Sequence, residues 1–191
     1  MDLHKFGIKF FADGAGKLDI LKLIPVYHRW IQQDALDDLL IDVADYSHVP
    51  AGPGVMLIAH EGNYALDETS HERGVLYYSK RRMEGEMPER LAQVARKALT
   101  AADLMSNDAE LEGALRIPGN RLEFFSNDRL AAPNTPEGYS GIEPDLRAFL
   151  DRLYAGAAYT LTRAGDSGER LALRAQAQGE VPLGTLLARL R

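Results

Sequence analysis

The stretch from Asp38 to Arg82 carries the strongest strand patterns of the chain and constrains the fold more than any other segment. Leu39 to Tyr46 alternates apolar and polar residues, which predicts a strand with one buried face. Val55 to His60 is apolar almost throughout, as expected of a central strand covered on both faces. The proline and glycine residues between them predict a hairpin, and Gly74 to Lys80 predicts one more strand after a polar loop.

Other short segments repeat this behaviour along the chain. Phe6 to Ala12 and Arg121 to Ser126 are rich in aromatic and branched residues, which favours strands. Ala158 to Arg163 and Arg170 to Gln176 alternate around a Gly-Asp-Ser-Gly turn, which predicts a second hairpin. The sequence therefore predicts a sheet built largely from antiparallel neighbours.

Four segments instead repeat apolar residues at the spacing of an amphipathic helix. These are Leu18–Gln32, Pro88–Asn107, Glu143–Tyr154 and Val181–Leu190. Pro88 suits the first turn of the second helix, because proline lacks the amide that a first turn leaves unpaired. Asn127 to Gly141 combines proline, glycine and small polar residues, and we interpret it as a long surface loop.

Together these elements predict an α+β fold, a mainly antiparallel sheet with helices packed on it, in a single domain covering residues 1–191. A second interpretation is two ferredoxin-like β-α-β-β-α pseudo-repeats, about 1–115 and 116–191. Each half has a strand with a Phe-Phe pair, at Phe10-Phe11 and at Phe124-Phe125. Chance similarity of two α+β halves is the competing explanation, because the strand Gly74–Lys80 has no counterpart in the second half.

Composition excludes several classes of functional site and of binding partner. The chain has no cysteine, which excludes disulfides, thiolate zinc sites and a cysteine nucleophile. The net charge of −6 argues against a nucleic-acid partner bound through general electrostatics. No apolar run approaches the length of about 20 residues that a membrane-spanning helix needs, and no signal peptide is recognisable at the N-terminus. We therefore expect a cytoplasmic protein with no membrane partner.

Ionisable side chains gather at the ends of the first predicted hairpin. Asp45, His48, His60 and Glu61 are the candidate catalytic residues, since histidine beside a carboxylate is a suitable general base. His48, His60 and Glu61 are also candidate ligands for a divalent metal such as Zn, Mn or Fe, provided that the loop folds back. No HExxH or other regular ligand spacing is present, and structural, hydrogen-bonded histidines are the commoner case.

Two classes of function follow. No GxSxG, P-loop or GxGxxG motif occurs; Gly14–Lys17 is the nearest approach to a phosphate loop, and an ordinary glycine turn is the favoured interpretation. The first hypothesis is a non-catalytic ligand-binding or assembly module, a homo-oligomer or the receptor of a small molecule, with Tyr77-Tyr78 offering aromatic surface. The alternative is a small metal-assisted or general acid/base hydrolase or isomerase that uses His60 and Glu61.

Overall fold

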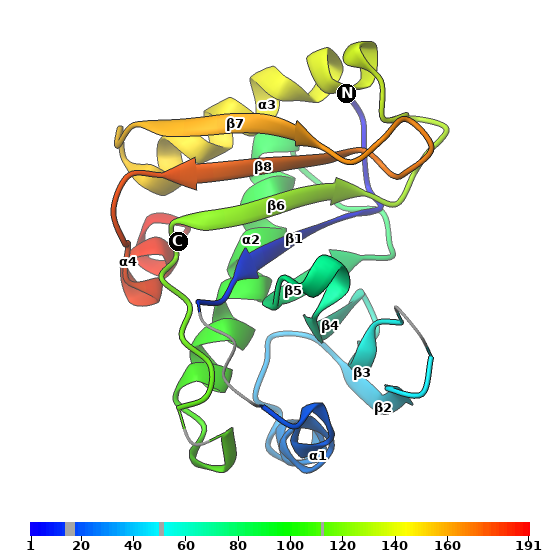
Figure 1. Cartoon of the computed structure of the whole chain (residues 1–191), viewed down its shortest axis with the longest axis vertical. Coiled ribbons are helices and arrows are strands. Elements are labelled where there is room, and N and C mark those ends of the chain that lie inside the picture. The colour runs from blue at the N-terminus through cyan, green and yellow to red at the C-terminus, as the bar shows by residue number, and fades with distance from the viewer. Residues whose placement is uncertain (14–17, 50–51, 112) are drawn as a thin grey trace.

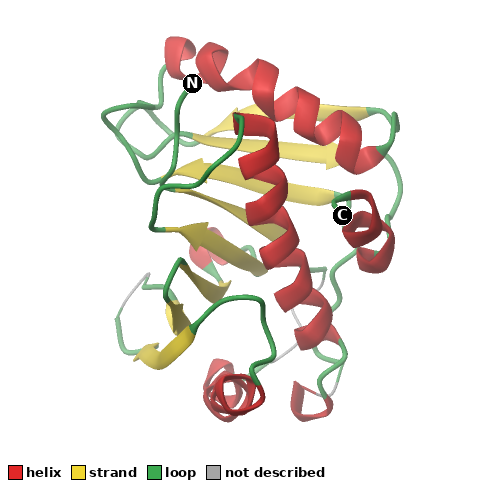
Figure 2. Ribbon diagram, turned by 180° about the vertical axis from the view of Figure 1, so that it is seen from behind, coloured by secondary structure: helices red, strands yellow, loops and turns green. Residues whose placement is uncertain are grey.

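A computed structural model describes residues 1–13, 18–49, 52–111 and 113–191, and shows an eight-stranded sheet with helices against one face (Figures 1 and 2). The strands are β1 Phe6–Phe11, β2 Leu40–Tyr46, β3 Gly54–Ala59, β4 Gly62–Asp67, β5 Gly74–Ser79, β6 Arg121–Ser126, β7 Tyr159–Ala164 and β8 Ala172–Ala177. The α-helices are α1 Leu23–Gln33, α2 Met87–Ser106, α3 Pro136–Tyr154 and α4 Leu183–Arg189. The turn Gly14–Lys17 lies outside the described residues.

The sheet has the strand order β2-β3-β4-β5-β1-β6-β8-β7, and every neighbouring pair is antiparallel. β1 lies in the interior between β5 and β6, and all six of its residues are buried. β2 and β7 form the two edges. The α+β class, the mainly antiparallel sheet and both predicted hairpins are thereby confirmed.

α2 is the central helix of the covered face and crosses it in contact with β1 and β5; in Figure 2, seen from behind, it lies in front of the sheet. Its N-terminus is closed by a capping box between Glu86 and Glu89. Small buried residues such as Ala95, Ala98 and Ala102 let the helix lie close to the strands. The helix also contacts α3 and α4, so it joins both halves of the chain into one core.

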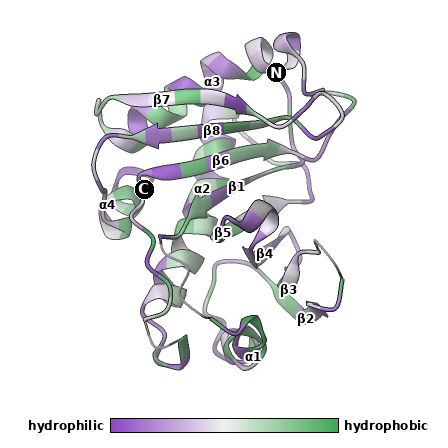
Figure 3. Cartoon of the chain, viewed as in Figure 1, coloured by the Kyte–Doolittle hydropathy of each residue, from purple (hydrophilic) through white to green (hydrophobic). Residues whose placement is uncertain are grey.

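None of the four described α-helices covers the other face of the sheet, which Figure 1 shows from the front. Hydrophobic and hydrophilic segments both occur along strands β6–β8 (Figure 3), as expected where only one face is covered by helices. A small apolar cluster nevertheless lies on the open face, and its members are buried by neighbouring side chains. They are Met56, Ala65, Leu76, Phe125 and Ala172.

Two expectations about loops were wrong. The segment after His60, predicted to be a polar loop, contains β4, whose six residues are all buried between β3 and β5. The loop predicted from Asn127 to Gly141 ends early, because α3 already begins at Pro136. Thr135 caps this helix by accepting a hydrogen bond from the Gly138 amide, so residues typical of turns serve as a helix start.

The pseudo-repeat is not confirmed. The second half follows the expected order, β6-α3-β7-β8-α4. The first half has four strands between α1 and α2 instead of two, because β4 and β5 extend the hairpin into a meander. Direct pairing of β1 with β6 makes the two halves one continuous sheet.

Candidate functional site

Two adjoining pockets lie where the β3–β4 turn meets α2. The first, which we call the inner cavity, has a volume of about 330 Å³. The second, the outer pocket, has about 830 Å³ and opens toward the start of β2. The inner cavity is lined by His60, Glu61, Tyr77, Ser79, Arg81, Arg82, Met83, Glu84, Gln93, Val94 and Lys97. The outer pocket is lined by Asp34, Ala35, Leu36, Asp37, Asp38, Leu39, His60, Glu61, Gln93, Arg96 and Lys97.

Lys97, on α2, lines both pockets and holds their walls together. Its Nζ donates hydrogen bonds to Glu61 Oε2 at 2.9 Å, to Asp38 Oδ2 at 3.2 Å and to the Asp37 carbonyl oxygen at 3.0 Å. The side chain of Asp38 is fully buried and that of Lys97 is 14 % exposed. All three ammonium protons are thus engaged, and the loop before β2 and the β3–β4 turn are both fixed to α2.

Glu61 is held in its charged form by this arrangement. The hydrogen bond from Lys97 lowers the pKa of the Glu61 carboxyl below its ordinary value, and the charge of Lys97 adds to the effect. The backbone amide of Glu61 donates to Asp38 Oδ1 at 3.3 Å, which orders the turn further. A carboxylate with a lowered pKa and a fixed cationic partner is a poor proton acceptor or donor at neutral pH.

Two tyrosines from neighbouring strands lie beneath Lys97. The rings of Tyr64 on β4 and Tyr77 on β5 are 4.6 Å apart, and Lys97 Nζ lies 5.4 Å from the Tyr77 ring centroid. Burial raises the pKa of both phenols, and the nearby Asp38 carboxylate raises them further. Both hydroxyls therefore stay neutral at physiological pH.

Two arginines are among the exposed residues that line the inner cavity, together with Glu61 and Glu84. Arg81 Nε donates to the His60 carbonyl oxygen at 3.1 Å, which leaves its terminal nitrogens unused by that bond. Arg82 has no hydrogen bond or ion pair with any described residue, and both guanidinium groups are exposed. Beside them Met83 and the buried Val94 supply apolar wall. The lining of the cavity therefore combines exposed cationic groups with apolar and aromatic surface.

The four predicted site residues divide into two pairs. His60 and Glu61 both line the two pockets. Asp45 and His48 lie at the opposite end of the β2–β3 hairpin, because Leu40 pairs with Ala59 whereas Asp45 pairs with Val55. Five residues of strand separate the two ends, roughly 17 Å.

The hairpin register therefore keeps His48 away from His60. Asp45 Oδ1 accepts a hydrogen bond from the Ser47 amide at 2.8 Å, and hydrogen bonds from Ser47 lower the pKa of the Asp45 carboxyl. Within the described ranges no three His, Asp or Glu side chains are grouped to hold a metal ion. The catalytic and metal roles of these residues stay predictions.

Sequence reasoning missed the residues that complete the site. Lys97 follows Arg96 on a long helix, where a basic pair is normally a solvated surface. Its carboxylate partners lie 36 and 59 residues away along the chain, so no local spacing marks the contact. Asp38 sits beside Asp37 just before a strand, and nothing in that pair of residues distinguishes the buried carboxylate from the exposed one.

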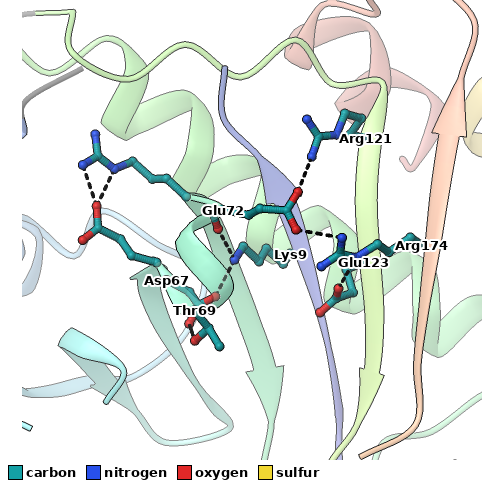
Figure 4. Close-up of polar contacts among 9 residues, drawn as sticks. Lys9, Asp67, Thr69, Glu72, Arg121, Glu123 and Arg174 are labelled. Atoms are coloured by element: carbon teal, nitrogen blue, oxygen red, sulfur yellow. Dashed lines mark hydrogen bonds and ion pairs between the residues drawn. The ribbon is translucent and has the colours of Figure 1, made fainter. Parts of the chain in front are cut away.

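A second polar cluster lies on the open face of the sheet (Figure 4). Lys9 Nζ donates to Asp67 Oδ2 at 2.5 Å, and Glu72 bridges Arg121 at 2.8 Å and Arg174 at 2.7 Å. These charges pair with one another and cover the apolar part of the strands. We therefore assign this cluster a structural role.

Comparisons of the chain with models of known protein families and with curated proteins gave no match. None of the helices in the described segments is long and apolar enough to cross a membrane. The functional proposal therefore depends on the geometry of the chain's own residues.

Proposed function

We propose that the protein is a non-catalytic binding module that holds a small organic anion in the inner cavity. The observation that carries this proposal is that the exposed Arg81 and Arg82 line the same cavity as Tyr77, Met83 and Val94. Its volume of about 330 Å³ matches small-molecule sites, which begin at about 300 Å³ and are mostly apolar with a few polar groups.

The charges inside the cavity favour an anion with an apolar body. Lys97 is already paired with Asp38 and Glu61, so the cationic groups left for a ligand are Arg81 and Arg82. A bound anion would share them with two carboxylates, Glu84 in the same cavity and Asp2, whose charge interacts with Arg82. A guanidinium group presents a planar set of donors that matches carboxylate and phosphate oxygens. An aromatic or aliphatic group attached to such an anion would contact Met83 and Val94.

Acid/base catalysis receives less support from the same geometry. Glu61 has a lowered pKa and a fixed partner, and burial raises the pKa of Tyr77. A general acid or base works best with a pKa near the working pH, and neither group is shifted toward neutrality. Binding without chemistry therefore accounts better for the side chains around His60 and Glu61.

Isothermal titration calorimetry with phenyl phosphate tests the proposal. We expect the wild-type protein to bind with a Kd of about 0.1–1 mM, a modest affinity suited to so small a ligand. Arg82→Gln should weaken binding by about tenfold, the usual loss of one charge-assisted contact. Arg96→Gln removes the same charge from the outer pocket, next to Lys97 in the sequence, and should leave the Kd unchanged. Equal losses in both variants, or no binding by the wild type, would contradict the proposal.

A further inference from the structure

β2 forms one edge of the sheet, and the strand with its two flanking segments carries four of the seven large apolar side chains that the described residues expose. Leu39, Ile41, Tyr46 and Val49 are 67, 54, 42 and 41 % exposed. Only three comparably exposed apolar side chains lie elsewhere in the described chain, at Met1, Leu21 and Leu130. A grouping of this kind on one strand and its flanks is typical of a surface that docks another molecule.

The backbone of this edge is closed to an added strand. The Val43 amide donates to the carboxylate of its neighbour Asp42 at 2.8 Å, and the register shifts between Leu40 and Asp42. A bulge and a carboxylate on an edge strand are devices that oppose strand pairing. A partner would therefore dock through side chains and not by extending the sheet.

The charge of this region selects the partner. No lysine or arginine occurs between Arg29 and Arg73. Four carboxylates around β2 have no lysine or arginine partner within the described residues, whereas Asp38 and Glu61 share Lys97. The four are Asp34, Asp37, Asp42 and Asp45. We call Leu39, Ile41, Tyr46 and Val49 together with these four carboxylates the β2 edge.

We propose that the β2 edge docks a basic protein segment with alternating apolar side chains. A second copy of the chain would place the same carboxylates opposite one another, and nucleic acid would be repelled for the same reason. The outer pocket adjoins Leu39 and also contains Arg96 and Lys97, but Asp34 and Asp37 line its side next to β2 and could receive a lysine or arginine side chain of the partner. The outer pocket adjoins the anion cavity and shares Glu61 and Lys97 with it, but the residues of the β2 edge do not line that cavity, so this inference does not rest on the proposed function.

Fluorescence anisotropy with a labelled short peptide of alternating lysine and valine tests this inference on the full chain. We expect saturable binding that weakens as salt is added, because exposed charges are screened. Leu39→Ser with Ile41→Ser should weaken binding at least fivefold, as should Asp34→Asn with Asp37→Asn. The matched controls are Leu130→Ser, which removes a leucine that is 98 % exposed outside the β2 edge, and Asp166→Asn.

The outcomes separate the alternatives. Unchanged binding in both controls, together with the two losses, supports the inference. Absence of binding by the wild type, or equal binding of a peptide with glutamate in place of lysine, overturns it. A concentration-dependent dimer in sedimentation equilibrium that Leu39→Ser with Ile41→Ser abolishes would assign the β2 edge to a second copy instead, and would also overturn it.

Discussion

The ion pair between Glu61 and Lys97 makes a contribution to stability that depends on pH. Because the folded protein lowers the pKa of Glu61, its pairing stabilises the fold above the ordinary glutamate pKa of about 4.5, and this contribution is lost as the pH falls through the lower folded value. The side chain of Glu61 is 58 % exposed, so the pair stabilises the fold by about 0.2–1 kcal/mol.

Glu61→Gln should therefore reduce the free energy of unfolding at pH 7 by up to about 1 kcal/mol. The difference from wild type should shrink as the pH is lowered below 4.5 in a series of urea titrations. Glu84→Gln is the control, since Glu84 lines the same cavity and no described residue forms an ion pair with it, and this variant should change the free energy of unfolding at pH 7 by less than about 0.5 kcal/mol. If the difference in free energy of unfolding between wild type and Glu61→Gln stayed constant down to acid pH, the ionised Glu61 carboxylate would not be the source of the stabilisation.

The residues of the site could be predicted only in part. His60 and Glu61 follow an apolar strand, and this local pattern correctly marks a strand end that lines a pocket. His48 fits the same pattern of an ionisable residue near a strand end. Its distance from His60 is set by the register of the hairpin, which the local sequence does not determine. The contact between Lys97 and Asp38 depends on how α2 crosses the sheet, which is set by tertiary packing and not by the local sequence.

At the scale of one element, β4 packs so closely on β5 that Gly62 has no room for a side chain. A Cβ placed on Gly62 would lie 2.3 Å from the Tyr77 ring and 2.4 Å from the Tyr78 carbonyl oxygen. Gly62→Ala should lower the free energy of unfolding by about 1–3 kcal/mol, the usual cost of overpacking. Gly168→Ala, where the added carbon meets nothing within 4 Å, should change it by less than about 0.5 kcal/mol. Equal effects in urea unfolding would contradict the packing of β4.

The helix α2 could be predicted from the sequence, whereas the strand β4 could not. α2 was predictable, because its apolar residues repeat at helical spacing over twenty residues. β4 was not, because Asn63 and Asp67 interrupt the apolar pattern although both are buried in the sheet. Each has at least one polar atom with a partner on a neighbouring strand: the Asn63 amide nitrogen donates to the Tyr78 hydroxyl, and Asp67 accepts from Lys9. Such partners exist only after the strands have paired.

The whole molecule depends on one continuous sheet and one helix that contacts both halves. Because β1 pairs with β6 and α2 contacts α3 and α4, the halves 1–115 and 116–191 should not unfold separately. In urea, the fluorescence of Trp30, the only tryptophan, should follow the same transition as the far-ultraviolet circular dichroism of the whole chain. Two transitions with different midpoints would indicate halves that fold independently.

A two-dimensional NMR titration with phenyl phosphate tests whether the inner cavity binds a small organic anion. We predict saturable shifts in the resonances of Tyr77, Met83, Gln93 and Val94, which line the cavity, and none in the loop around Asp166. Phenol, which lacks the charge, should shift the same resonances only weakly. Shifts confined to the open face of the sheet around Arg174, or no saturable shift at all, would contradict the proposed function.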